Sequence, residues 1–274
     1  MVRRALTRLR ELLTDPEVAG CDPDSAEFAI AHRRVVQRKP MVRDLFASFY
    51  AECRAMDRRH FGATPGARLE IGSGSSFMAE LYPDVIMTDV IPVPFVQIVL
   101  SAEEMPFGDG TLRSVYGINV FHHLTQPRRF FRECHRVLHP GGGVVLIEPY
   151  HGPLARFIFR NLHGSERFDP SVLSWETEAG TGTMSGANQA LSYIVFTRDR
   201  HRFDREYPEL ELVVDRPHTH LRYLLSGGVN FRQLIPSSFG GAVAKLEDVL
   251  APFNRWLALQ HTIVLRRRGS SEVS

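Results

Sequence analysis

One short stretch constrains the fold of this chain more than any other. At residues 68–76 the sequence RLEIGSGSS runs from a strand-like segment into a Gly-Ser-Gly turn, and an apolar helix signal follows at 77–81. Glycines at such a junction allow positive φ, and they let a ligand approach the bare amide groups at a helix N-terminus. The pattern predicts a strand, a tight loop and a helix that together cradle a nucleotide.

Composition limits the class of protein. With 274 residues, 43% of them hydrophobic and 23% charged, the chain is expected to form one large α/β domain with appendages. A net charge of +2 is too small to suggest a nucleic-acid or anionic-membrane partner. Three scattered cysteines argue against a disulfide framework and a cysteine metal site. No apolar run approaches the roughly 18 residues of a membrane span, so a soluble, cytoplasmic protein is expected.

Residues 1–62 carry helical patterns and no convincing strand. The strongest is an amphipathic run over residues 45–56, separated from earlier runs by prolines. An arginine cluster at the start is spaced like the solvated face of a short helix; it comprises Arg3, Arg4, Arg8 and Arg10. The segment is expected to be an N-terminal helical lid over the site, or else simply to pack on the sheet.

From residue 66 strands alternate with helices, which predicts a doubly wound, seven-stranded parallel sheet. The expected strands span residues 68–71, 85–88, 96–100, 114–118, 144–147, 211–215 and 261–266. A helix capped by Thr125 or Gln126 is expected to stop at residues 140–143, and another is expected around 242–259. The core is therefore assigned to residues 63–151 and 210–268. Ligands of such sheets bind beyond the carboxyl ends of the strands, so four strand ends should share one crevice.

Residues 152–209 interrupt the strand pattern and are expected to form a cap insertion, because structureless loops of this length are unusual and often functional. The insertion holds a predicted helix at 154–162 and a stretch of small residues at 178–186, and a disordered tail is expected at 269–274. Its aromatic residues are expected to close an apolar pocket over a bulky acceptor, or alternatively to form the core of the insertion; they are Phe157, Phe159, Phe168, Trp175 and Phe196.

The glycine loop by itself does not identify the nucleotide. Dinucleotide-binding proteins use G-x-G-x-x-G, in which the third glycine permits close packing of helix on strand. Phe77 stands at that point of this chain, and no nucleotide-triphosphate loop is present. The sequence therefore disfavours a nicotinamide-dependent oxidoreductase.

The motifs that follow carry a family resemblance. The segments LEIGSG at 69–74, Asp89, SAEEMPF at 101–107, NVFHHL at 119–124 and RVLHPGG at 136–142 occur in that order. Together they resemble the class I S-adenosylmethionine-dependent methyltransferases, in the type 11-like branch of small-molecule enzymes. The resemblance covers roughly residues 66–150.

The resemblance implies a cofactor site for S-adenosylmethionine, with S-adenosylhomocysteine as product. The glycine loop should underlie the methionine part, Asp89 should accept the ribose hydroxyls, and Ala102 should border the adenine. The implied set is Glu70, Gly72, Ser73, Gly74, Asp89, Val90, Ser101, Ala102, Glu103, Asn119 and Val120. Two positions depart from the family pattern: Ser76 replaces a frequent glycine, and Ser101 replaces a common aspartate, for which Glu103 is a possible substitute.

Transfer to a hydroxyl also requires a group that removes a proton. His122 and His123 follow a strand end, and imidazole accepts protons near neutrality. Glu148, after the next strand, is expected to orient an imidazole or to bind a substrate hydroxyl, as in similar sugar O-methyltransferases. Alternatively, one ring of the pair only packs. His218 and His220 lack a neighbouring carboxylate or cysteine in the sequence, so no metal site is expected.

These observations predict a methyltransferase of secondary metabolism acting on a hydroxyl of a natural product, sugar or glycoside, such as a polyketide, a glycoside or a lipid-linked sugar. C- or N-methylation of a bulky apolar metabolite remains an alternative, and so does a non-catalytic protein of the same fold. A homodimer is an open alternative to a monomer, and no nucleic-acid partner is expected.

Overall fold

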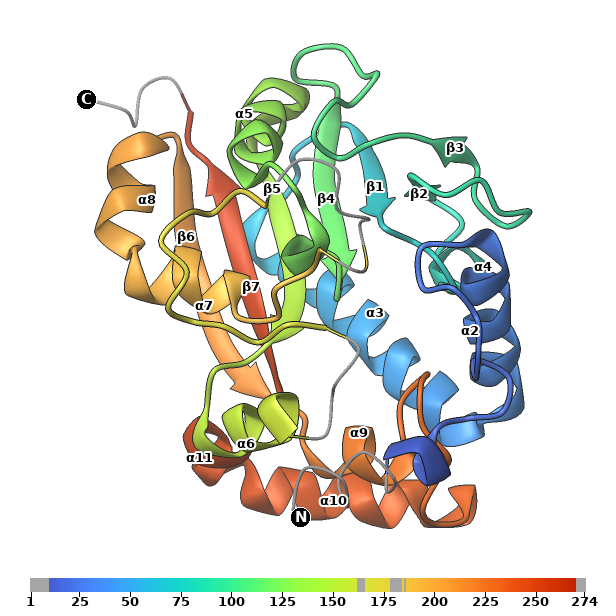
Figure 1. Ribbon diagram of the computed structural model, residues 1–274. Helices are drawn as coiled ribbons and strands as arrows, with labels where there is room; N and C mark the ends of the chain where they lie inside the picture. The colour runs from blue at the N-terminus through green and yellow to red at the C-terminus, as the bar shows by residue number, and fades with distance from the viewer. Residues whose placement is uncertain (1–9, 162–165, 178–183, 185, 270–274) are drawn as a thin grey trace.

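The computed structural model describes residues 10–161, 166–177, 184 and 186–269 (Figure 1). The predictions for arginines 3–8, for most of the small-residue stretch 178–186 and for tail residues 270–274 lie outside these residues. No described helix is both long enough and apolar enough to cross a membrane.

A seven-stranded sheet forms the centre of the molecule, in the order β3-β2-β1-β4-β5-β7-β6. The strands are β1 (Ala67–Ile71), β2 (Val85–Asp89), β3 (Ile98–Val99), β4 (Leu112–Ile118), β5 (Leu138–Pro149), β6 (Leu210–His218) and β7 (Gln260–Arg267). The first five are parallel, whereas β7 runs antiparallel to both of its neighbours. The predicted doubly wound, seven-stranded fold is confirmed, with one reversed strand.

The glycines at 141–143 have a different role from the one predicted. The helix α5 (Pro127–Val137) ends before them, and β5 begins at Leu138. A Cβ on Gly143 would lie 2.2 Å from the Leu265 carbonyl oxygen and 2.3 Å from the Phe61 ring. Gly143 therefore lets β7 and the residue that ends the N-terminal helix approach the strand closely.

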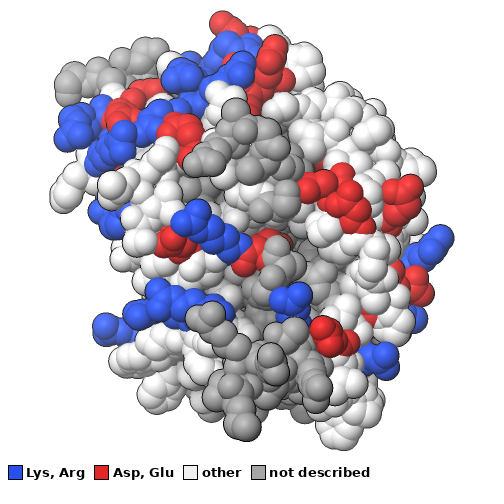
Figure 2. Space-filling view, viewed as in Figure 1, with Lys and Arg blue, Asp and Glu red and all other residues white. Residues whose placement is uncertain are grey.

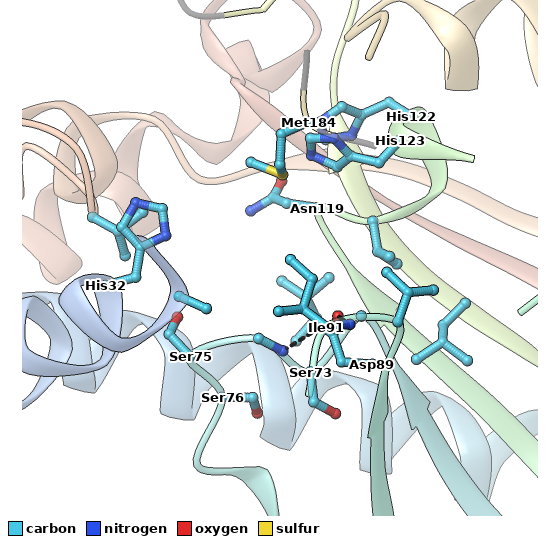
Figure 3. A pocket seen from close by; sticks show the side chains of 18 of the residues that line it. His32, Ser73, Ser75, Ser76, Asp89, Ile91, Asn119, His122, His123 and Met184 are labelled. Atoms are coloured by element: carbon cyan, nitrogen blue, oxygen red, sulfur yellow. Dashed lines mark hydrogen bonds between the residues drawn. The ribbon is translucent and has the colours of Figure 1, made fainter. Parts of the chain in front are cut away.

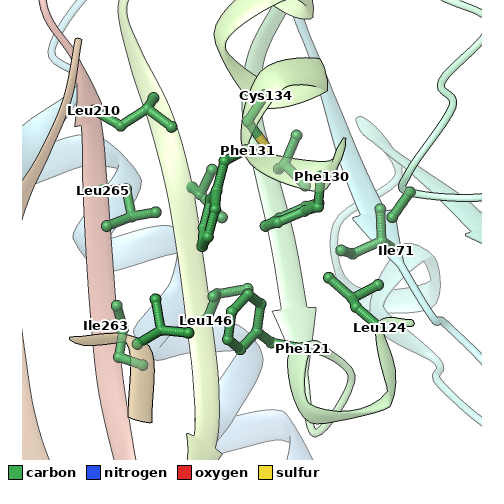
Figure 4. Close-up of a cluster of buried hydrophobic side chains, with 14 of the residues drawn as sticks. Ile71, Phe121, Leu124, Phe130, Phe131, Cys134, Leu146, Leu210, Ile263 and Leu265 are labelled. Carbon is green, nitrogen blue, oxygen red and sulfur yellow. The ribbon is translucent and has the colours of Figure 1, made fainter. Parts of the chain in front are cut away.

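Helices cover both faces of the sheet (Figure 1). On one face lies α3 (Pro40–His60), whose buried apolar side chains pack on β4, β5 and β7. Its Asp57 accepts hydrogen bonds from Arg113, Ser114 and Tyr116 of β4. On the other face, α5 packs on the sheet through Phe130, Phe131 and Cys134 (Figure 4). The N-terminal helix α3 is thus part of the core, while α2 (Ala26–Arg38) lies toward the carboxyl ends of β1 and β2.

The insertion, residues 152–209, contributes side chains both to the hydrophobic core and to the lining of a cavity. It contains α6 (Pro153–Asn161), α7 (Leu191–Tyr193), a π-helical turn (Ile194–Arg198) and α8 (Arg200–Glu206). Trp175 and Phe196 are buried against α5 in the main core. The expectation that these two residues close an acceptor pocket is wrong, because both are buried in the core and neither lines the cavity; the alternative expectation, a core position, fits them.

The C-terminal part follows the predicted strands but adds helices. These are α9 (Leu221–Ser226), α10 (Gly240–Leu250) and α11 (Asn254–Leu257), with 3₁₀ turns at Ser237–Phe239 and Ala251–Phe253. The predicted helix around 242–259 is thus broken near Pro252, which lacks a backbone N–H. The short helix α9 was not predicted.

Candidate functional site

The glycine loop lies at the carboxyl end of β1, where its backbone requires glycine. Gly72 has φ +57° and Gly74 has φ +40°. A Cβ on Gly72 would lie 2.1 Å from Cγ2 of Val120, which belongs to the loop after β4. Asn119 beside it also adopts a positive φ of 53°. The two loops therefore touch through a position that no side chain can occupy.

Asp89, at the end of β2, holds the loop in place. Its Oδ2 accepts a hydrogen bond from the Gly74 amide at 2.7 Å, and its Oδ1 accepts one from the Ile91 amide at 2.9 Å (Figure 3). Each carboxylate oxygen has a second lone pair. Asp89 can thus fix the loop and still accept hydrogen bonds from a ligand in the cavity that it lines.

Glu70 lies beneath the loop and is fully buried. It accepts a hydrogen bond from Ser73 Oγ at 3.0 Å. Burial raises the pKa of Glu70 to about 7, although hydrogen bonds from Ser76 and Ser73 act in the opposite direction. A carboxyl group near half-ionisation at neutral pH is one whose charge a cationic ligand would stabilise.

The N-terminal helices also support the loop, which the sequence did not reveal. Tyr50 of α3 accepts hydrogen bonds at its phenolic oxygen from Ser76 Oγ (2.9 Å) and from the Phe77 amide (3.3 Å). Arg33 of α2 donates to the Ser76 carbonyl oxygen. Ser76 therefore serves as an attachment point for α3. The only signal in the sequence was a hydroxyl on an otherwise apolar helix face.

One cavity of about 300 Å³ collects these residues (Figure 3). All eleven residues expected to bind the cofactor line it, and so do His122 and His123. Four acidic side chains line it as well, and among its described lining residues there is no lysine or arginine; the acids are Glu70, Asp89, Glu103 and Glu166. An acidic cavity of this kind favours a cationic ligand over an anionic one.

His122 is held between two carboxylates. Its Nδ1 lies 2.6 Å from Glu148 Oε2, and its Nε2 lies 3.3 Å from Glu166 Oε2. Burial by itself lowers the pKa of His122, but the charge and hydrogen bond of Glu148, followed by those of Glu166, outweigh it and raise the pKa to about 10. His122 is therefore an imidazolium at neutral pH, which makes it a poor proton acceptor.

Glu148 does not face the cavity. Its side chain is fully buried, and it accepts hydrogen bonds from the amides of Val120 and Phe121, each at 2.8 Å, besides that from His122. Burial raises the pKa of Glu148, but the charge of His122 more than offsets this and lowers it. Glu148 thus orients the loop and the imidazole. The alternative expectation, contact with a substrate hydroxyl, does not fit its burial.

His123 lies against its neighbour, with 4.1 Å between the two ring centroids. Ligand atoms of His122, His123 and Glu166 all fall within 4.8 Å of one another, but the protonated His122 has no nitrogen lone pair with which to bind a metal ion. The spacing arises because Glu166, in the insertion, reaches the pair from a distant part of the chain. No local pattern indicated Glu166. His218 instead contacts the hydroxyl groups of Thr219 and Thr262, each at 2.8 Å.

The outer wall of the cavity is apolar and comes from several segments. Of the five aromatic residues named in the insertion, only Phe159 lines it. Phe28 and Phe46 contribute from the N-terminal helices, and Tyr223 from α9. His32 stands on the wall opposite the histidine pair (Figure 3), and burial lowers its pKa to about 4.

Comparisons with known proteins find one matching family model and several similar solved structures. Residues 69–146 match the family model of a methyltransferase domain. Similar solved structures include YcgJ from Bacillus subtilis, with 14% identity over 80% of this chain and 98% of that one, at a TM-score of 0.45. Geranyl diphosphate C-methyltransferase from Streptomyces coelicolor A3(2) has 15% identity over 94% and 89%, at a TM-score of 0.42.

A third similar structure is an S-adenosylmethionine-dependent methyltransferase from Mesorhizobium loti, with 12% identity over 78% of this chain and 96% of that one, at a TM-score of 0.42. Likenesses this distant carry no argument about the acceptor. No curated protein matches the chain significantly.

Proposed function

We propose that this chain, a class I S-adenosylmethionine-dependent methyltransferase, transfers the methyl group to a hydroxyl of a small-molecule acceptor with an apolar body. The observation that carries the proposal is one acidic cavity lined by the glycine loop, Asp89 and the histidine pair. S-adenosylmethionine supplies an activated methyl group on a positively charged sulfur. The cavity provides negative charge for that ion. Its floor includes Gly72 and Gly74, where the backbone can approach the cofactor closely because no side chain intervenes.

The cofactor contacts follow from the chemistry of the lining. Asp89 would accept the ribose hydroxyls with the lone pairs that the Gly74 and Ile91 amides leave. Glu70, ionised by a cation above it, would attract the ammonium group of the cofactor. Ser101, Ala102 and Glu103 would border the adenine. Glu103 also accepts a hydrogen bond from the Gln126 amide at the start of α5, so its carboxylate is already positioned.

Within the histidine pair we assign proton removal to His123, because His122 retains its own proton. The acceptor oxygen would attack the methyl carbon in line with the departing sulfur, which keeps the electron pair of the broken C–S bond. His123 would take the hydroxyl proton. His122, fixed by Glu148 and Glu166, would position the loop and the neighbouring ring.

The acceptor would be neutral. The wall formed by Phe28, Phe46, Phe159 and Tyr223 suits an apolar body, and Asn230 and Gln260 offer amides for its hydroxyls. The acidic lining would repel a phosphate. A natural product or glycoside of secondary metabolism fits this wall, with residues 152–209 contributing to the acceptor side and residues 1–62 closing it.

The first test is calorimetry with S-adenosylmethionine and S-adenosylhomocysteine on the purified protein, together with a mass spectrum that looks for co-purified product. We expect one cofactor per chain. Failure to bind at saturating cofactor would contradict the assignment, and a fluorescence change with NADH instead would favour an oxidoreductase.

A panel of neutral acceptors then tests whether the methyl group is transferred to a hydroxyl. We expect methyl transfer to oxygen and loss of turnover when both histidines are changed. If the double variant still turns over an amine or a carbon nucleophile, N- or C-methylation replaces O-methylation. If the cofactor binds and no acceptor of any class is methylated, a non-catalytic binding protein becomes the better description.

A further inference from the structure

The helical segment that precedes β7 exposes a continuous apolar stripe. From the 3₁₀ turn before α10, through α10 and the next 3₁₀ turn, to α11, large apolar residues recur at intervals of three, four and seven; they are Phe239, Leu246, Val249, Phe253 and Trp256. Their side chains are between 46% and 71% exposed. Residues spaced three, four and seven positions apart share one helix face. A helix normally turns such a face toward the core, and this one turns it outward.

The orientation of this helix is fixed by its other face. Val243 and Glu247 are buried. Glu247 accepts hydrogen bonds from the amides of His220 (3.1 Å) and Arg222 (2.8 Å), and it forms an ion pair with the Arg222 side chain. These contacts tie α10 to α9. The stripe therefore cannot turn inward without leaving the Glu247 carboxylate unpaired.

Basic side chains flank the stripe. Lys245 and Arg255 lie on the same helical segment, and Arg255 stands 4.8 Å over the Trp256 ring. The neighbouring helix α6, which contacts α11, adds exposed Arg156, Phe157 and Arg160. None of these four cations forms an ion pair within the described part of the chain, and Asp248 is the exposed acid of α10.

The surface near α5 and α8 differs. Near α5 and α8, at the upper left of Figure 2, basic and acidic side chains are interleaved, as in the ion pairs of Arg128, Arg200 and Arg202. Basic side chains at the lower left of that view stand mostly beside uncharged atoms. The small net charge of the chain is an average that conceals this local excess.

We propose that the face formed by α10, α11 and the exposed side of α6 binds the surface of an anionic lipid bilayer. A stripe of Phe, Leu and Trp bordered by Lys and Arg is the pattern of a helix that lies in a membrane interface. A second copy of the chain fits less well. In a twofold dimer the same patch meets itself, so the four cations would face four cations.

Membrane binding would bring the cavity to the bilayer. Helix α6 carries Phe157 in the exposed face and Phe159 in the cavity wall, and α10 packs on α9, which supplies Tyr223 to that wall. An acceptor with a lipid anchor would then enter from the membrane. This consequence rests on the proposed function, whereas the binding itself does not.

Tryptophan fluorescence gives a site-specific test. The chain has two tryptophans; Trp175 is 2% exposed and Trp256 is 46% exposed. Vesicles of phosphatidylcholine with phosphatidylglycerol should shift the emission of the full-length protein to shorter wavelength, whereas pure phosphatidylcholine vesicles should not. Trp256→Phe should abolish the shift. No shift, or an equal shift with neutral vesicles, would overturn the proposal.

Co-sedimentation supplies the matched variants. We expect the double variant Val249→Gln, Phe253→Gln to lose roughly tenfold or more in vesicle affinity, and Arg156→Ala, Arg160→Ala to lose several-fold with a weaker dependence on salt. Leu173 is an exposed apolar residue of the insertion that does not belong to the proposed face. The control variant Leu173→Gln should therefore bind vesicles with wild-type affinity.

Calorimetry with S-adenosylhomocysteine should give the same affinity for wild type and for the Val249→Gln, Phe253→Gln variant. Loss of cofactor binding would thus count against the proposed function and not against the membrane face. If light scattering finds a wild-type dimer that this variant converts to monomer, without any vesicle binding by wild type, the face is a contact between copies and the proposal fails.

Discussion

The floor and the wall of the cavity are built in opposite ways. The floor comes from consecutive strand ends within residues 70–123, where Asp89 accepts hydrogen bonds from the amides of Gly74 and Ile91. The wall comes from α2, α3, α6, α9 and the insertion residues Glu166, Met184 and Gln189, which lie far apart in the chain. The floor is therefore fixed by backbone geometry, whereas the wall can change its side chains without disturbing the sheet. This difference predicts which substitutions affect the cofactor and which affect the acceptor.

The largest effect is expected in the floor, at Gly72. A Gly72→Ala change would place a Cβ 2.1 Å from Val120 at a φ of +57°. We expect cofactor affinity to fall by at least about a hundredfold, since both strain and steric clash oppose the loop. Calorimetry with S-adenosylhomocysteine measures this affinity. Gly241→Ala is the matched control, because nothing lies within 4 Å of the added atom; affinity within twofold of wild type for both variants would contradict the role of Gly72.

The histidine pair lies between the floor and the wall. Substitutions of its two members should have different effects on kcat and on thermal stability. His123→Asn is expected to lower kcat by about two to four orders of magnitude, the usual contribution of a general base, with the cofactor affinity unchanged. His122→Asn should disturb the ion pairs with Glu148 and Glu166, so its loss should appear in thermal stability as well. If His122→Asn lowers kcat and His123→Asn does not, the assignment of the proton acceptor is reversed.

A smaller effect is expected at Asp89. Asp89→Asn keeps one acceptor oxygen but cannot serve both the Gly74 and Ile91 amides as a carboxylate does. Loss of a charged hydrogen bond is worth about 1.5–3 kcal/mol, or roughly 10- to 150-fold in cofactor affinity. Acceptor KM should hardly change. If Asp89→Asn instead raises the acceptor KM and leaves cofactor affinity normal, Asp89 contacts the acceptor and not the cofactor.

The smallest effect on cofactor affinity is a pH dependence that Glu70 introduces. Its pKa is about 7 in the folded protein, against an ordinary glutamate value of 4.5. A raised pKa contributes stability that is fully present below pH 4.5 and is lost as pH rises through 7. At about 1.4 kcal/mol per unit, the loss is on the order of 3 kcal/mol.

Glu70→Gln cannot ionise, so thermal unfolding without cofactor should show a gain over wild type at about pH 8 and little at about pH 4.5. Cofactor affinity of wild type should rise several-fold between about pH 6 and 8 as the carboxylate ionises, and that of Glu70→Gln should not. Parallel pH profiles for the two proteins would contradict a charged role for Glu70.

Local patterns in the sequence were enough to predict the order of the strands along the chain, the glycine loop after β1 and the place of Asp89 at the end of β2, because each depends on neighbouring residues or on a regular period. The cofactor class came from the resemblance of the motifs to a known family. The local patterns misplaced the glycines at 141–143, which lie within β5 and not at the end of α5; Gly143 packs against Leu265 and Phe61. They could not place Tyr50 on Ser76 or Glu166 on His122, since those contacts join residues 26 and 44 positions apart.

The charge of His122 and the direction of the apolar stripe on α10 depend on tertiary structure alone. Periodicity showed that this segment is helical but did not show that Glu247 would face inward. The physical reason is the same in each case. Burial and long-range charge set the protonation state of a side chain and the exposed face of a helix, and neither is encoded in the local spacing of residues.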